Sequence, residues 1–296
     1  MSYLQGVSAP QLTPFHDDGS VNLEEYTRLS EYLAEAGLKG IFVCGTTGEF
    51  VNLTLEERKS LLQAAVKGSK GRCKIMFNVT AMNLQNMKEL CDFARDNGAD
   101  CLSLTPPYYH RYDGAAMEQY FVRAASLAPD MPVYLYNMPG MTHNPLTPDV
   151  LKKVCAQCEN VVGIKDSSMD HMTFLDFQMA QPREDFELIT GNDAQLLTAL
   201  MAGGAGGVIA MAGVYPKLCQ KIYDDFKAGD MAGAKAAQDK VHMLRAMVRR
   251  VMPVMAHKEM LKMQGFDMGP ARFPFRELTQ AEKDEIHACV KSLGLA

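Results

Sequence analysis

The chain of 296 residues lacks several features that would place it in particular classes of protein. No apolar run approaches the roughly 18 residues that a membrane-spanning helix needs. Residues 1–7 show no basic stretch followed by an apolar one, so we expect no secretory signal and a cytoplasmic protein. The net charge of −5 gives no electrostatic reason to expect nucleic acid or an anionic membrane as a partner.

Metal-binding patterns are also missing. The eight cysteines include one CxxC, formed by Cys155 and Cys158, but no second CxxC and no paired histidine follows, as a zinc site would require. Several cysteines lie in apolar runs, which indicates buried free thiols in a reducing compartment. We interpret the CxxC as helix packing, with a redox or metal role as the alternative, and expect no bound metal.

The sequence does contain a regular alternation of short apolar runs and helical patterns. Eight apolar runs are present: Gly6–Thr13, Gly40–Cys44, Cys73–Val79, Cys101–Thr105, Val133–Tyr136, Val161–Ile164, Phe186–Thr190 and Gly207–Met211. Helical periodicity is clearest between them at Leu23–Ala36, Leu55–Lys67, Leu84–Asn97, Ala115–Leu127, Pro148–Cys158, Met172–Met179 and Ala194–Ala202. Strands that alternate with helices pair in parallel, and eight such units close into a (β/α)8 TIM barrel. The predicted fold class is α/β.

The pattern changes after the eighth apolar run. Helical periodicity alone continues at Lys217–Ala228, Met231–Val251, around Pro253–Gln264 and at Gln280–Leu293. We therefore predict a catalytic barrel domain over residues 1–215 and a C-terminal helical appendage over residues 216–296.

Lys165 is the most informative residue of the chain. It follows Val161–Ile164, an apolar, β-branched run that is typical of a buried strand. Burial disfavours an ammonium group, and a neutral amine is a nucleophile that forms a Schiff base with a ketone or an aldehyde. The alternative is a lysine that extends from the strand end to solvent.

Other strand ends carry reactive groups as well. Active sites of TIM barrels lie at the C-terminal ends of the strands, and these ends include Gly45–Glu49, Tyr136–Gly140, Lys165 and Thr190–Asp193. A nucleophilic lysine, Tyr136 as general acid and base, and the Thr46 and Thr47 hydroxyls as proton relay and carboxylate binder would make an imine-forming site. Simpler alternatives are a tight turn at residues 45–48, a core aromatic at Tyr136 and a helix cap at Asp193.

These residues resemble the motifs of the dihydrodipicolinate synthase / N-acetylneuraminate lyase family of class I aldolase-like barrels. The resemblance runs from about residue 6 to 293 in the family's order and spacing. It rests on Gly45-Thr-Thr-Gly-Glu49, Thr105-Pro-Pro-Tyr-Tyr109, Tyr136-Asn-Met-Pro139, Gly163-Ile-Lys-Asp166, Gly191-Asn-Asp193 and Gly204-Ala-Gly-Gly-Val-Ile209. The set is specific for the family but not for the substrate of one member.

The resemblance implies a Schiff base between Lys165 and the keto group of pyruvate, or of a 2-oxo acid that breaks down to pyruvate. Tyr136 would carry protons to the imine and to the acceptor oxygen, while Thr46 and Thr47 would hold the pyruvyl carboxylate. Because the lysine imine is itself the electron sink, neither a metal nor an organic cofactor is implied.

An oligomer is implied by the same resemblance. Thr47 would link Tyr136 to Tyr109, which in the family reaches in from a neighbouring subunit of a homodimer or homotetramer. Gly191 would line the substrate site, and the backbone of Ile209 would lie beside the imine. The expected partner is a small-molecule substrate, with no nucleic acid and no membrane.

Two positions depart from the founding members on the acceptor side. In dihydrodipicolinate synthases, which this chain resembles, an arginine binds the carboxylate of the acceptor at the position where this chain has Met141. A methionine cannot form a bidentate contact with a carboxylate. Arg111 is one residue that could compensate. Sialic acid lyases, which this chain also resembles, have the motif Gly-Tyr-Asp-Glu where this chain has Gly191-Asn-Asp-Ala194. Ala194 therefore stands in place of the acidic residue that would bind sugar hydroxyls.

The sequence therefore predicts a pyruvate-dependent Schiff-base lyase that makes or cleaves a carbon–carbon bond between pyruvate and an aldehyde. The 2-oxo acid would be a 2-oxo-3-deoxy or a 4-hydroxy-2-oxo acid. Alternatives are 4-hydroxy-tetrahydrodipicolinate (dihydrodipicolinate) synthase with altered acceptor binding, N-acetylneuraminate lyase, a dehydratase that uses the same imine, and a non-catalytic oxo-acid binding protein.

Overall fold

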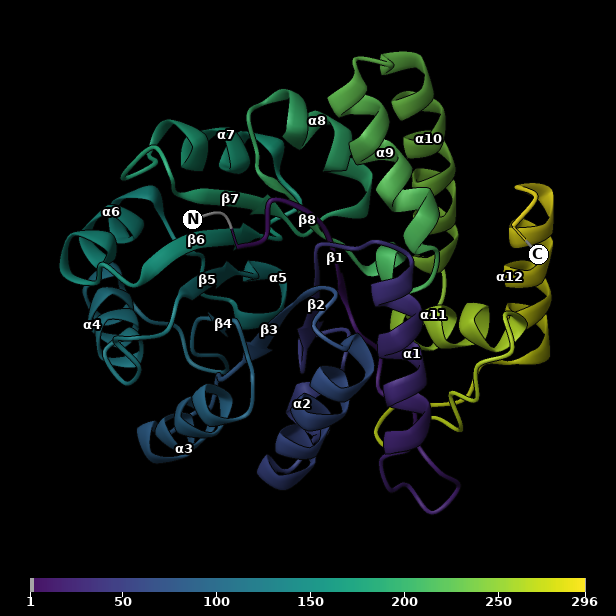
Figure 1. Cartoon of the computed structure of the whole chain (residues 1–296), viewed down its shortest axis with the longest axis horizontal. Helices are drawn as coiled ribbons and strands as arrows, with labels where there is room; N and C mark the ends of the chain where they lie inside the picture. The colour runs from purple at the N-terminus through teal and green to yellow at the C-terminus, as the bar shows by residue number, and fades with distance from the viewer. Residues whose placement is uncertain (1–2, 296) are drawn as a thin grey trace.

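A computed structural model describes residues 3–295 and contains a closed barrel of eight parallel strands in sequential order. The predicted (β/α)8 fold is confirmed, because each apolar run of the sequence overlaps one strand. The strands are β1 (Gly6–Pro10), β2 (Gly40–Val43), β3 (Lys74–Asn78), β4 (Cys101–Leu104), β5 (Val133–Asn137), β6 (Val161–Asp166), β7 (Glu187–Thr190) and β8 (Gly206–Val208). Figure 1 shows them in the middle of the molecule with helices around them.

The helices between the strands, except α5 and α8, begin at side-chain caps. Thr54 and Glu57 form the capping box of α2, and Thr147 caps α6, whose first residue is Pro148. These helices are α1 (Leu23–Glu35), α2 (Leu55–Ser69), α3 (Leu84–Asp96), α4 (Gly114–Ala125), α5 (Pro139–Thr142), α6 (Pro148–Gln157), α7 (His171–Met179) and α8 (Leu196–Met201). Short 3-10 helices span Phe50–Asn52, Asp193–Gln195 and Ala210–Gly213.

The chain after residue 215 forms four helices: α9 (Pro216–Ala228), α10 (Met231–Val248), α11 (Pro253–Met263) and α12 (Gln280–Ser292). Figure 1 shows α9 and α10, in green, side by side next to the barrel, and α12, in yellow, at the far edge of the molecule. Buried residues of α9–α12 belong to the same hydrophobic cluster as the outer side of the barrel. The appendage therefore packs directly on the barrel.

Two predicted boundaries were wrong, and one short helix was not predicted. The eighth strand ends at Val208, because the apolar residues Ala210–Gly213 form a 3-10 helix rather than continuing the strand. The short helix α5 at Pro139–Thr142 was not predicted, since its four residues are too few for helical periodicity. Helix α10 also ends at Val248, three residues before the expected Val251.

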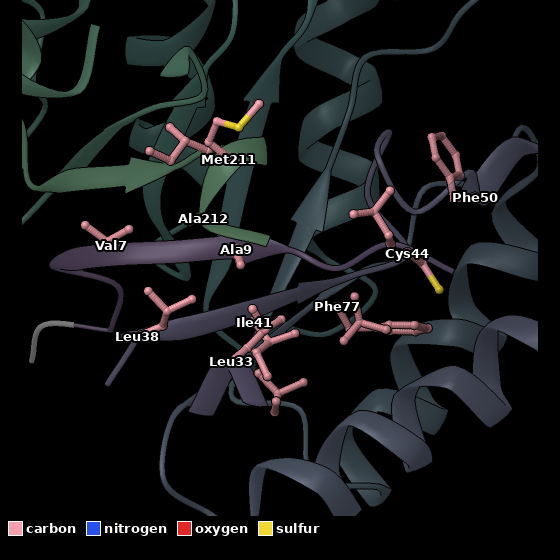
Figure 2. Close-up of a cluster of buried hydrophobic side chains, with 14 of the residues drawn as sticks. Val7, Ala9, Leu33, Leu38, Ile41, Cys44, Phe50, Phe77, Met211 and Ala212 are labelled. Carbon is pink, nitrogen blue, oxygen red and sulfur yellow. The ribbon is translucent and has the colours of Figure 1, made fainter. Parts of the chain in front are cut away.

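Two clusters of buried apolar side chains hold the barrel. The larger one lies between strands and helices, and Figure 2 shows part of it, including Val7, Ala9, Ile41 and Leu33. The smaller one contains Leu4, Phe42, Met76, Cys101, Tyr134, Tyr136, Ile189 and Val208. Side chains of this cluster therefore fill the inside of the barrel, as is usual for this fold.

Candidate active site

Lys165 and Tyr136 face each other at the ends of adjacent strands. They are register partners on β6 and β5. The Lys165 side chain is buried, at 4% exposure, and its Nζ lies 4.1 Å from the ring centroid of Tyr136 and 4.8 Å from that of Phe42. The lysine therefore does not extend into solvent. Its amine instead lies against two aromatic rings.

The ends of β5 and β6 are joined by the residues that directly follow Tyr136 and Lys165. Asn137 and Asp166 are also register partners, and the Asn137 side-chain amide donates a hydrogen bond of 2.7 Å to the Asp166 carboxylate. The Asn137 side-chain oxygen accepts from the backbone N–H of Leu146, and its carbonyl accepts from that of Ser167. These hydrogen bonds fix the backbone at the strand ends and so the direction in which the side chains of Tyr136 and Lys165 point.

The Tyr136 hydroxyl is surrounded by groups that stabilise a phenolate. It lies within hydrogen-bonding distance of the Thr46 hydroxyl, at 3.4 Å. Burial raises the pKa of Tyr136, but the positive charge of Lys165, together with hydrogen bonding from Thr46, Ser167 and Lys165, outweighs burial and lowers that pKa below its ordinary value. The tyrosine is thus suited to exchanging a proton with a group bound at Lys165.

A cavity of about 480 Å³ opens above this pair. Six residues expected at the site line it: Thr46, Thr47, Tyr136, Met141, Lys165 and Gly191. Ile209 is fully buried beneath, while its neighbours Val208 and Ala210 line the cavity. Met141 is 63% exposed and lies at the rim.

Tyr109 lies outside this cavity within the single chain. It is 85% exposed and has a left-handed backbone with φ of 82°. Its loop is nevertheless fixed, because the Asn144 side-chain amide donates to the carbonyls of Pro107 and His110 at 2.8 and 2.7 Å. The proposed relay through Thr47 to Tyr109 stays a prediction that concerns a second subunit. Arg111, in the same loop, is exposed and is not among the residues that line the cavity.

Position 191 requires a glycine because the side chains of Ser167 and Lys165 lie too close for a Cβ atom. A Cβ atom at this position would overlap the Ser167 hydroxyl and would lie 2.8 Å from Cε of Lys165. The missing side chain therefore leaves the space in which the lysine extends.

Asp193 is not the helix cap that the sequence offered as a simpler alternative, because the residue that caps the short helix Asp193–Gln195 is Asn192. The Asn192 side chain accepts from the Ala194 N–H, while the Asp193 carboxylate accepts from that of Met211 at 2.7 Å.

The Gly45–Glu49 turn is anchored by a buried ion pair that the sequence did not reveal. Glu49 adopts a left-handed conformation with φ of 62°, and its Oε1 lies 2.6 Å from Nζ of Lys258 on α11, with neither side chain exposed. Burial raises the pKa of Glu49 and lowers that of Lys258, and their attraction opposes both changes. The ion pair thus connects the appendage to the turn that carries Thr46 and Thr47.

Three further side chains of the cavity that carry a titratable group come from the appendage and were also missed. Arg245 of α10, Arg249 directly after α10 and His257 of α11 line it. His257 is 4% exposed, and its Nε2 has no hydrogen-bond partner within residues 3–295. Burial lowers the pKa of His257, against smaller opposing effects of Asp193 and the Pro253 carbonyl. The only sequence signal was a pair of arginines four residues apart, which places both on one helix face.

The chemistry available in the cavity is that of amine, phenol, hydroxyl, imidazole, guanidinium and carboxylate groups, the carboxylate being that of Asp193. Across the described residues, no cluster of three or more histidine, cysteine or acidic side chains could hold a metal ion. The eight cysteines are free, and Cys155 and Cys158 are buried. Among the helices within 3–295, none combines the length and apolar character needed to cross a membrane.

Comparisons with known proteins identify the family of the chain. The profile of the dihydrodipicolinate synthetase family matches residues 3–293. A 4-hydroxy-tetrahydrodipicolinate synthase from Methanoculleus marisnigri is 32% identical over 98% of this chain and 99% of the relative. The Escherichia coli K12 protein named "Probable 2-dehydro-3-deoxy-D-pentonate aldolase YjhH" is 28% identical over 100% of this chain and 98% of its own.

A solved structure extends the likeness to the whole fold. YagE, a prophage protein of the dihydrodipicolinic acid synthase family from E. coli K12 in complex with pyruvate, superposes with a TM-score of 0.94 at 26% identity and covers 100% of both chains. Since the family profile spans almost the whole sequence, the chain belongs to the dihydrodipicolinate synthetase family and is a lyase.

Proposed function

We propose that the protein is a pyruvate-dependent Schiff-base lyase that makes or cleaves a carbon–carbon bond between pyruvate and an aldehyde. The observation that carries this proposal is the buried amine of Lys165, which lies 4.1 Å from the Tyr136 ring at the floor of the cavity. A buried amine beside a phenol that can move protons is the arrangement that imine chemistry requires. The pyruvate complex of the related YagE fold adds support.

The proposed reaction begins with imine formation. The Lys165 amine adds to the C2 carbonyl of pyruvate, and Tyr136 gives a proton to the oxygen as the carbinolamine forms. Loss of that oxygen as water, with a second proton, leaves the imine. Thr46 and Thr47 line the cavity, and in this proposal their hydroxyls hold the carboxylate.

Carbon–carbon bond formation follows from the same intermediate. The imine accepts the electron pair left when a C3 proton departs, which gives an enamine. The enamine C3 attacks the aldehyde carbon, and the aldehyde oxygen takes a proton by way of Tyr136. Water then releases the 4-hydroxy-2-oxo acid and restores the amine. Cleavage is the same sequence in reverse, so the residues serve both directions.

The acceptor side argues against the two founding activities. Met141 provides no guanidinium for the carboxylate of aspartate semialdehyde, and Ala194 provides no acid for the hydroxyls of a sialic acid. We therefore favour a 4-hydroxy-2-oxo or 2-oxo-3-deoxy acid over both. The placement of a proton-transferring tyrosine beside the lysine also disfavours a protein that only binds oxo acids.

Borohydride trapping tests the proposal. The protein is incubated with pyruvate, reduced, digested and analysed by mass spectrometry. We expect one reduced pyruvate per chain on the peptide that contains Lys165, and none in Lys165→Ala. Lys262→Ala, which changes a lysine on α11 outside the cavity lining, serves as a control and should retain the adduct. An unmodified Lys165 in the wild-type protein would refute the imine mechanism.

A further inference from the structure

Two arginines at the cavity share a single weak acceptor. Arg245 Nη2 and Arg249 Nη1 donate to the sulfur of Met169, at 3.2 and 2.9 Å. A thioether is a poor acceptor for a guanidinium, which forms its strongest contacts with carboxylate or phosphate oxygens. Within residues 3–295, no ion pair joins either arginine to an acidic side chain.

The two positive charges are held close together despite their repulsion. Arg245 lies in the last turn of α10 and Arg249 is the residue that caps its C-terminal end, so the two lie four residues apart on the same side of the helix, where like charges disfavour each other. Burial lowers the pKa of Arg245, and the charge of Arg249 acts in the same direction, whereas Asp193 opposes both. An anion bound between the two guanidiniums would remove this repulsion.

The arginines belong to the same cavity as the proposed nucleophile. Met169, which contacts both of them, follows Lys165 by four residues in the loop after β6. His257 lines the cavity too, and its Nε2 lacks a partner although the side chain is 4% exposed. A buried imidazole nitrogen without a partner carries a desolvation cost that a substrate oxygen can relieve.

Apolar side chains form most of the remaining wall. They are Met138, Met141, Val208, Val248, Val251 and Val254. Such a wall suits the carbon chain of a substrate and offers few partners for a series of hydroxyls. The guanidinium and imidazole groups that could bind a distal group therefore come from the appendage, while Ser167, Ser168 and Asp193 are further polar residues of the lining.

We propose that Arg245 and Arg249, assisted by His257, form a subsite for an anionic group at the far end of the acceptor. This inference rests on the proposed lyase function. The second substrate is then a carboxylate- or phosphate-bearing aldehyde, and the adduct is a 2-oxo acid with a second acidic group. Carboxylate and phosphate groups both offer the oxyanion that two guanidinium groups bind.

Matched acceptors test the subsite. With pyruvate present, kcat/KM is measured for succinic semialdehyde against butanal and for glyceraldehyde 3-phosphate against glyceraldehyde. Charge-assisted hydrogen bonds of this kind correspond to about 10- to 100-fold in kcat/KM. We expect Arg245→Gln and Arg249→Gln to lower turnover of the anionic aldehydes by that factor and to leave the neutral aldehydes unchanged. The preferred anionic acceptor distinguishes carboxylate from phosphate.

Arg250→Gln is the matched control, because this arginine is the next residue after Arg249 and instead lies 3.5 Å from Glu285. It should turn over every acceptor as the wild type does. Equal losses on anionic and neutral aldehydes in the Arg245 and Arg249 variants, or no loss on either, would overturn the subsite.

A binding measurement separates this inference from the lyase function. If the wild-type protein forms no pyruvate adduct, the lyase function fails, and the subsite is tested by thermal unfolding with succinate or inorganic phosphate. Either anion should raise Tm of the wild type and of Arg250→Gln but not of the Arg245→Gln/Arg249→Gln double variant. An equal rise in the double variant, or no rise in the wild type, would reject the anion subsite.

Discussion

Tyr136 and Lys165 are direct partners across β5 and β6, with the lysine Nζ 4.1 Å from the tyrosine ring centroid. The following pair, Asn137 and Asp166, is joined by a hydrogen bond of 2.7 Å. The strand pairing itself thus places the amine and the phenol together, before any loop contributes. A parallel register is hard to shift by one residue, because a shift would exchange the inner and outer faces of the strand.

The ionisation of Tyr136 should depend on Lys165. The pKa of Tyr136 is raised by burial but lowered overall, chiefly by the charge of Lys165. We expect one tyrosine to give the tyrosinate absorbance at a lower pH than the others, and this signal to be lost in Tyr136→Phe. In Lys165→Ala the same titration should move to higher pH. Spectrophotometric titration is favourable because the chain has 11 Tyr and no Trp.

The sign of the accompanying stability change follows from the lowered pKa. The folded protein releases the phenol proton at a lower pH than the unfolded chain, so unfolding takes up a proton in between. The contribution of Tyr136 to the free energy of unfolding is fully present above the ordinary tyrosine pKa of about 10. It is lost as the pH falls through the lowered pKa of Tyr136 in the folded protein. A Tyr136 titration that is unchanged in Lys165→Ala would contradict the assigned cause.

Gly191→Ala should block the site without unfolding the barrel. The added methyl group overlaps the Ser167 hydroxyl and approaches Cε of Lys165, so the lysine cannot keep its position. We expect the rate of pyruvate trapping to fall by about 100-fold, the cost of a misplacement of roughly 1 Å. Gly114→Ala is the control, since its Cβ meets only Val150 at an ordinary 3.6 Å. A trapping rate equal to that of the control would show that Gly191 is not needed for close approach.

The barrel and its reactive strand ends could be predicted because their signals are local. Each strand is a short apolar run, and Lys165 stands out as a charge directly after one. Ala210 and Met211 were wrongly included in the eighth strand, because a short apolar run does not distinguish a strand from one turn of helix.

Other parts of the site depend on tertiary packing. Lys258 lies 209 positions after Glu49 (258 minus 49), and nothing in either local pattern indicates that the two side chains meet. Arg245 and His257 likewise read as ordinary residues of amphipathic helices. Their position at the cavity follows from how α10 and α11 pack on the barrel, which a pattern of apolar residues does not specify.

The Glu49–Lys258 pair should be costly to break on one side only. Lys258→Met leaves an uncompensated buried carboxylate, so the free energy of unfolding should fall by about 3–5 kcal/mol. Glu49→Gln combined with Lys258→Met removes both charges and should recover much of this loss. Denaturant unfolding of both single variants and the double variant completes a double-mutant cycle. Additive losses would show that the two side chains do not stabilise each other.

The same pair should affect pyruvate binding through the Gly45–Glu49 turn. If Glu49 positions Thr46 and Thr47, the double variant should have a raised KM for pyruvate even where stability has recovered. Lys59→Met, which removes an exposed ion pair with Glu56 and Glu89, is the control and should change neither quantity much. A KM equal to that of the wild type in the double variant would restrict the pair to a structural role.

Tyr109 should act in a neighbouring subunit. It is 85% exposed in the single chain, although the side chain of Asn144 fixes the loop that carries it. If each site combines its own Lys165 with the partner's Tyr109, mixing Tyr109→Phe with Lys165→Ala creates hybrid dimers with one intact site. Random reassociation makes half of the dimers hybrid, each with one of two sites intact. Activity should therefore recover to about one quarter of the wild-type level.

The two parent variants provide the baseline for that experiment, since each should be nearly inactive when assayed separately. Light scattering measures whether the protein is a dimer or a tetramer, and dilution should lower activity as the dimer dissociates. If Tyr109 served its own chain, every hybrid would pair one site without the lysine and one without the tyrosine. The mixture would then show only the average of the two parents. Recovery above that average thus separates a shared site from a self-contained one.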